Sequence, residues 1–135
     1  MRRARLVKDQ DITSGLRILF LFHAIIAGLV GLQHLVAPRV WTDLAGMVIT
    51  ETVTWRLIGA ALVGFAVSSW LAYRETAWAR VRIIVIMEIV WSVLGALVIL
   101  WGILFEGLPS LEWLNVVLLA GFAAAFSIVL SKRQI

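Results

Sequence analysis

Residues 82–105 read RIIVIMEIVWSVLGALVILWGILF, a run of 24 residues in which Glu88 is the one charged side chain after the first position. A hydrocarbon layer of roughly 30 Å needs about 20 apolar residues in a helix. A backbone in lipid must also satisfy its own hydrogen bonds, which a helix does within one segment. Comparable runs cover about residues 16–37, 55–73 and 111–130. The sequence therefore predicts an all-α integral membrane protein, a four-helix bundle.

The composition excludes several other classes of protein. The chain has 135 residues, of which 62% are hydrophobic and 15% are charged, against a usual charged fraction of about 25%. These values argue against a disordered chain and against a soluble enzyme with a polar shell. The absence of cysteine excludes disulfides, thiol catalysis and thiolate metal sites. We expect a single membrane domain over residues 1–135.

The basic residues predict how the bundle is oriented. In a soluble protein the net charge of +4 would suggest a nucleic-acid partner, but here the basic residues flank apolar runs, so no nucleic acid is expected. Positively charged loops stay on the cytoplasmic side of a membrane. We therefore predict a multi-pass protein of the inner (plasma) membrane with both termini cytoplasmic. Ten of the twelve basic residues fall on that side: Arg2, Arg3, Arg5, Lys8, Arg17, Arg74, Arg80, Arg82, Lys132 and Arg133.

The one long connection, residues 38–54, is expected on the outer side. It mixes apolar and polar residues, which suits a short helix lying in the interface with Trp41 at headgroup depth. Thr52 and Thr54 are candidate N-caps of the following helix.

Polar groups inside the apolar runs are few, and each needs a physical reason. His23 in the first run and Glu88 in the third are expected at similar depth. Glu88 also begins a stripe of small and polar residues with Ser92 and Gly95 at helical spacing. One interpretation is that His23 and Glu88 face each other as a proton-carrying or ligand-anchoring pair. The other is a structural hydrogen bond, or a Glu88 close enough to the inner interface to reach water or Arg82.

A second polar group is predicted at the outer interface, around His34 and Arg56. Arg56 lies one residue inside the second run and could donate to an anionic or carbonyl-bearing ligand, with His34 as a second donor. Alternatively it pairs with Asp43 or Glu51 and holds the loop in place. The candidate ligand-binding residues are thus Glu88, His23, His34 and Arg56.

Other kinds of site are not expected from the sequence. Both histidines lie on one helix, so a single chain cannot supply the facing pair that bis-histidine haem needs. Two His and one Glu at different depths do not make a metal centre, and no catalytic set of residues is present. Asn115 is expected to cap or to form a hydrogen bond near the outer interface.

Pairs of small residues four positions apart predict close helix contacts in lipid. They do not distinguish packing within one chain from dimerisation. The pairs are Ala24 and Gly28, Ala27 and Gly31, Ala60 and Gly64, Ser92 and Ala96, and Gly121 and Ala125.

Two segments carry a family resemblance: residues 31–38, GLQHLVAP, and residues 55–72, WRLIGAALVGFAVSSWLA. In these the chain resembles the DoxX-like group of small prokaryotic membrane proteins, over about residues 18–105. The resemblance implies a four-helix inner-membrane bundle, and some relatives serve as a membrane subunit in quinone-linked oxidation. Only Arg56 and the 34–38 segment match well enough to carry over, as a ligand-side cluster. The chain shows no redox centre, so oxidation chemistry would have to come from a partner chain.

These observations favour a protein without catalytic activity of its own. We expect either a subunit of a larger membrane complex or a bundle that binds a quinone or a lipid, with partner chains or a homo-oligomer as further contacts. The alternative is a dimeric, proton-coupled transporter of small molecules that uses Glu88 as the exchanged carboxylate. An enzyme acting on lipids through His34 and Arg56 is the weakest alternative, because no activated nucleophile is evident.

Overall fold

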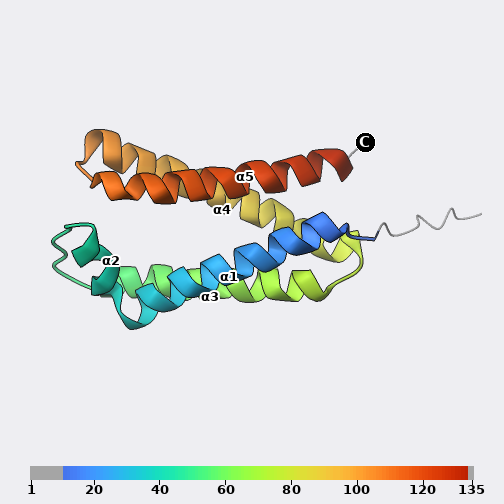
Figure 1. Ribbon diagram of the computed structural model, residues 1–135, viewed down its shortest axis with the longest axis horizontal. Helices are drawn as coiled ribbons and strands as arrows, with labels where there is room; N and C mark the ends of the chain where they lie inside the picture. Colours follow the sequence, from blue (N-terminus) through green and yellow to red (C-terminus); the bar gives the residue numbers. More distant parts are fainter. Residues whose placement is uncertain (1–10, 134–135) are drawn as a thin grey trace, which may run out of the picture.

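The computed structural model describes residues 11–133, and it is all-helical apart from its connections and one isolated backbone bridge between Asp11 and Ala77 (Figure 1). Four of its helices are long and apolar enough to cross a membrane. The elements in chain order are α1 (Ser14–Val36), α2 (Pro38–Leu44), α3 (Val53–Arg74), α4 (Trp78–Phe105), a 3-10 turn η1 (Ser110–Glu112) and α5 (Trp113–Arg133). The predicted helix class is therefore confirmed, although α4 begins at Trp78 instead of about Arg82.

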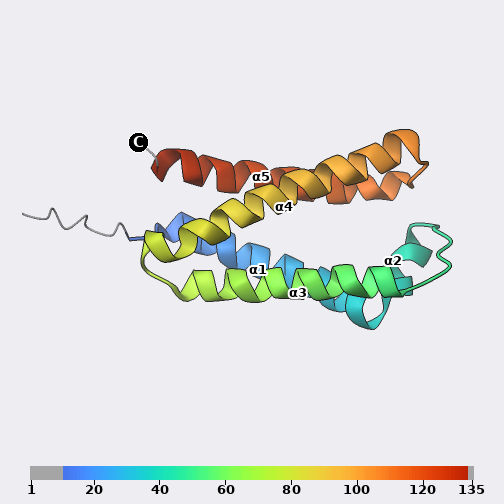
Figure 2. The same cartoon turned by 180° about the vertical axis from the view of Figure 1, so that it is seen from behind.

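The four long helices form two pairs. Helix α1 packs along α3, and α4 packs along α5. Helix α4 runs obliquely, from beside α1 and α3 at its start to α5 at its finish (Figure 2). We call the end of the bundle where α1 and α4 begin the terminal end, and the end that holds α2 and η1 the loop end. The two pairs approach at the terminal end and diverge toward the loop end (Figures 1 and 2).

Large apolar side chains cover much of the outer surface of the bundle. Ile18 on α1, Ile83 and Val98 on α4, and Val117 on α5 are 66%, 74%, 70% and 68% exposed, respectively. Water would disfavour so large an apolar surface, whereas lipid tails match it. Together with the lengths of the helices, this surface indicates a multi-pass membrane protein in contact with a lipid bilayer.

The tightest helix contact is the crossing of α1 and α3 at Gly31 and Gly59. A methyl group added at Gly59 would lie 2.5 Å from the backbone nitrogen of Leu35 and 2.7 Å from the carbonyl oxygen of Gly31. The two backbones thus touch because neither position carries a side chain. In contrast, a methyl group at Gly64 or Gly121 would meet nothing within 4 Å. The small-residue pattern therefore marks one real crossing and two positions with open space beside them.

An apolar core closes the terminal end. Phe20 of α1 and Phe126 of α5 are fully buried with ring centroids 5.5 Å apart, and Val81 and Val85 of α4 pack into the same cluster. The chain before α1 is held to the connection between α3 and α4, where the Ile12 N–H donates to the Thr76 carbonyl at 2.8 Å. This core fixes the start of α4 against α1 and α3.

The connection at the loop end contains the short helix that the sequence predicted, α2. The expected capping of α3 is wrong in detail, however. Thr52 holds the N-cap position, but its side chain makes no capping hydrogen bond. The Glu51 carboxylate accepts the Thr54 N–H instead, at 3.0 Å. A carboxylate suits this place because the first N–H groups of a helix have no partner within the helix.

Candidate functional site

A polar ring joins three helices near the terminal end: His23 of α1, Ser69 of α3 and Glu88 of α4. The Ser69 hydroxyl donates to Glu88 Oε1 at 2.9 Å, and His23 Nδ1 lies 2.9 Å from Ser69 Oγ. His23 Nε2 lies 3.2 Å from Glu88 Oε2, although this contact lacks hydrogen-bond geometry. Ser69 and Glu88 are fully buried and His23 is 5% exposed. The ring is therefore closed to solvent.

The protons of this ring can be counted. The single Ser69 proton goes to Glu88, so Ser69 accepts the N–H of His23 Nδ1. His23 Nε2 and Glu88 Oε2 face each other at 3.2 Å, and a further proton could be held by either group. On the imidazole it would make an ion pair, and on the carboxyl a neutral pair. Both arrangements leave the ring with zero net charge, which is what burial in lipid favours.

The structure brings His23 and Glu88 together, and this is the contact that the first interpretation of the sequence predicted. Arg82, the alternative partner for Glu88, forms no ion pair among residues 11–133. Sequence reasoning missed Ser69, because a serine in an apolar helix is commonly a small packing residue and nothing local marks its depth. The next residue of the α4 stripe, Ser92, is fully buried, and its hydroxyl has no hydrogen-bond partner within residues 11–133.

A cavity of about 500 Å³ lies between the two helix pairs. His23 lines it toward the terminal end, and His34 lines it toward the loop end. These residues are eleven positions apart, so the cavity extends roughly 16 Å along α1 at 1.5 Å per residue. Its walls are mainly apolar and aromatic, and the lining includes Ala27, Val30, Trp55, Trp91, Leu94, Gly95, Leu118 and Phe122. A volume between about 300 and 1,000 Å³ is usual for a small-molecule site.

Glu112 is the main polar group of the cavity at the loop end. It is 5% exposed, and its Oε1 accepts the indole N–H of Trp41 at 2.8 Å. Its Oε2 accepts the side-chain amide N–H of Asn115 at 2.7 Å. All three residues line the cavity. The hydrogen bond between Trp41 and Glu112 also ties the first helix pair to the second at this end.

Sequence reasoning found only part of this cluster, which consists of Trp41, Glu112 and Asn115. A hydrogen bond for Asn115 was expected, and its partner proves to be the carboxylate three residues earlier. Trp41 was expected at headgroup depth, but its indole N–H points into the protein, to Glu112. The spacing of Glu112 and Asn115 was the available local signal. The contact between Trp41 and Glu112 joins residues 71 positions apart, and no local sequence signal indicated it.

His34 is also buried and lines the same cavity as this cluster. Its Nδ1 lies 2.9 Å from the Val30 carbonyl of its own helix, so Nδ1 carries the proton that is donated. The ring lies against Trp55, with centroids 5.5 Å apart. Nε2 is thus the ring nitrogen left for a further contact.

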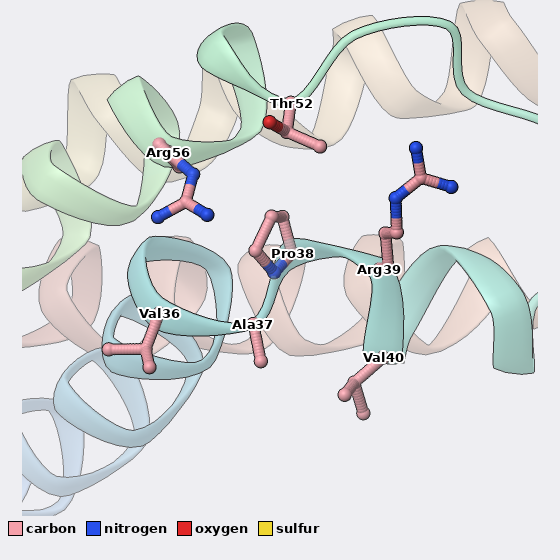
Figure 3. Close-up of a pocket in the computed structure, with 7 residues that line it drawn as sticks. All are labelled: Val36, Ala37, Pro38, Arg39, Val40, Thr52 and Arg56. Carbon is pink, nitrogen blue, oxygen red and sulfur yellow. The ribbon is translucent and has the colours of Figure 1, made fainter.

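Arg56 lines a different cavity, of about 390 Å³, together with Arg39 and Thr52. Figure 3 shows the two arginines on either side of Pro38, with the Arg56 guanidinium over the last turn of α1. That guanidinium donates to the Leu35 carbonyl at 2.8 Å.

The expected pairing of Arg56 with a loop carboxylate is corrected by this geometry, and the placement of Arg56 relative to His34 is also seen. Among residues 11–133 it forms no ion pair with Asp43 or Glu51. The last carbonyls of α1 lack partners within the helix, and the Leu35 carbonyl accepts a hydrogen bond from the guanidinium. Arg56 is therefore engaged by α1 and not by a loop carboxylate. His34 and Arg56 also line separate cavities, so the structure does not assemble them as donors to one ligand.

Comparison with known proteins adds no relative: no family model, no curated protein and no solved structure matches the chain. The class of protein is therefore defined by the fold and the cavity: a small helical protein with four candidate membrane spans. The chain is assigned to no family, and the DoxX-like resemblance stays a prediction.

Proposed function

We propose that this protein binds an apolar molecule of the membrane, a lipid or a quinone, between its two helix pairs. The observation that supports the proposal is the cavity of about 500 Å³, with apolar walls and polar groups at both ends. Helices that pack only to support each other in lipid fill the space between them. Here α4 and α5 diverge from α1 and α3 and leave room for an elongated guest.

We place both termini in the cytoplasm and the protein in the inner (plasma) membrane. The distribution of basic residues supports this orientation. Arg74, Arg80 and Arg82 lie at the terminal end, whereas Arg39 and Arg56 are near α2 at the loop end. Four of the basic residues on which the predicted orientation depends lie outside the described residues: Arg2, Arg3, Arg5 and Lys8. The loop end would then face outward.

We further propose that the protein has no catalytic activity of its own and acts within a larger membrane complex. The DoxX-like resemblance supports this assignment, since some relatives are membrane subunits of quinone-linked oxidation. A partner chain would supply any redox chemistry. The residues considered for the ligand are Glu88, His23, His34 and Arg56, of which only His23 and His34 line the cavity.

Native mass spectrometry of the protein, purified gently from its own membrane, tests the binding proposal. We expect one lipid or quinone for each chain. The variant Ala27→Phe places a ring in the cavity, because Ala27 lines it and is 5% exposed. This variant should lose the bound molecule while circular dichroism stays unchanged.

The matched control is Ala124→Phe, at an exposed position of α5 outside the cavity lining. It adds the same ring on the outer surface and should keep the bound molecule. Equal occupancy in the two variants would mean that the guest sits elsewhere, and the proposal would fail.

The second candidate function is proton-coupled transport with Glu88 as the exchanged carboxylate. The ring of His23, Ser69 and Glu88 favours it, because two titratable groups lie 3.2 Å apart in it and it contacts the cavity through His23. A transporter in vesicles should lose proton-linked uptake in Glu88→Gln. A binding subunit should keep its assembly and its guest in the same variant, so one substitution separates the two functions.

A further inference from the structure

Glu112 is a buried carboxylate without a cationic partner. Its side chain contacts the cavity, and among residues 11–133 it takes part in no ion pair. Both of its oxygens act as acceptors, which is the pattern of an ionised carboxylate. A buried negative charge that meets only neutral N–H donors is costly, and a cationic group in the cavity would offset that cost.

The side chains of Glu112, Asn115 and His34 offer the cavity mainly acceptors. A carboxylate has about four acceptor positions, and two are used. Asn115 gives one of its two amide N–H groups to Glu112, which leaves its amide oxygen and the other N–H. His34 donates through Nδ1, so in a neutral ring Nε2 is an acceptor as well. A headgroup that donates hydrogen bonds therefore finds the most partners among these three side chains. A carbonyl head, such as that of an oxidised quinone, would find only the remaining N–H of Asn115 as a donor among them.

Aromatic residues reinforce the preference for a cation. Trp41, Trp55 and Trp91 line the same cavity, and the face of an indole ring attracts cations. The opposite end of the cavity offers no comparable anchor. His23 turns Nδ1 to Ser69 and Nε2 to Glu88, so the cavity wall at this end is mainly apolar. An elongated guest should then put its polar head at Glu112 and its apolar tail toward His23.

We propose that the cavity binds a single-chain amphiphile with an ammonium head, held at Glu112, Asn115 and His34. This inference rests on the proposed function and names the chemical class of its ligand. It favours a cationic lipid-like molecule over a quinone.

The test compares three amphiphiles that have the same alkyl tail and different head groups. Dodecylammonium, dodecanol and dodecanoate are added to the protein in lipid nanodiscs, and occupancy is measured by native mass spectrometry with Ala27→Phe as the background. We expect dodecylammonium to bind about tenfold more tightly than dodecanol, the effect of one charge-assisted hydrogen bond. Dodecanoate should bind the weakest of the three.

Glu112→Gln removes the charge and preserves the size of the side chain. It should reduce the affinity for dodecylammonium about tenfold and change that for dodecanol little. Glu106→Gln is the matched control, because Glu106 also accepts an indole N–H, that of Trp101, but is exposed and outside the cavity lining. It should leave both affinities unchanged.

The outcomes separate this inference from the function on which it rests. Equal binding of the three probes by the wild-type protein would overturn the inference and leave the proposed function standing. Retained ammonium preference in Glu112→Gln would also overturn it. If no probe binds the wild-type protein more than Ala27→Phe, and nothing co-purifies with it, then both proposals fail.

Discussion

The two helix interfaces of this bundle are built on different principles. Between α1 and α3 the backbones touch at Gly31 and Gly59, with no space for even one methyl group. Between the helix pairs the space widens to a cavity, and polar contacts join the pairs at its ends: His23 and Ser69 with Glu88, and Trp41 with Glu112. Lipid gives helices no hydrophobic reason to associate, so packing and hydrogen bonds must hold them together. The first interface uses backbone packing. The second combines an apolar core at the terminal end with hydrogen bonds at the ends of the cavity, which leaves room for a guest between them.

The polar ends of the cavity also differ from each other. At the terminal end the carboxylate of Glu88 is fully buried, and its polar neighbours form a closed ring. At the loop end Glu112 is slightly exposed and retains unused acceptor positions. Both ends thus hold a buried carboxylate, but Glu88 accepts a hydrogen bond within the fold and does not line the cavity, whereas Glu112 lines it.

The largest effect is expected from removing the hydrogen-bonded tie at Glu88. Glu88→Ala leaves Ser69 and His23 without their partner and should lower the free energy of unfolding by about 3 kcal/mol. Glu88→Gln should cost about 1 kcal/mol or less, because the amide oxygen can accept from Ser69 and the amide N–H can donate to His23 Nε2. Unfolding in mixed micelles measures both. Equal losses would show that the charge itself stabilises the bundle.

A smaller effect is expected from disturbing the packed interface. Gly59→Ala forces α3 away from the backbone of α1 and should cost about 2 kcal/mol. Gly64→Ala lies on the same helix in open space, so it should be neutral or gain up to about 0.8 kcal/mol in helix propensity. The same unfolding assay applies to both variants. A similar change in stability for the two would argue against backbone contact at Gly59.

The smallest effect is expected at an exposed polar contact outside both interfaces. The hydrogen bonds from Thr54 hold the pKa of Glu51 below its ordinary value of 4.5. A lowered folded-state pKa means that Glu51 stabilises the fold above its ordinary pKa, and that this contribution disappears as the pH falls through the lowered value. Thermal unfolding between about pH 6 and about pH 3 should show a slight decline that Glu51→Gln reduces. An identical pH profile in that variant would contradict the role of Glu51 as a cap.

The sequence predicted the spans well and the polar contacts unevenly. Hydropathy is a property of successive residues, so the expected run at residues 16–37 closely matches α1. The depths of His23 and Glu88 could be counted from the ends of their helices, and this made their contact a reasonable expectation. The partner of Arg56 was missed because a free carbonyl at the end of α1 cannot be recognised as an acceptor until the helix ends are placed in space.

Length and hydrophobicity alone thus established an all-helical chain with four segments able to cross a membrane, because the match between a helix and a bilayer is decided one segment at a time. The segregation of charge likewise predicted an orientation. Only the tertiary structure decided which helices pair, since this depends on where a glycine of one helix meets a glycine of another. It also decided that the pairs diverge, that a cavity opens between them, and that Trp41 and Asn115 leave Glu112 facing it. The candidate site is among the features that only the tertiary structure decided, because its residues come from distant parts of the chain.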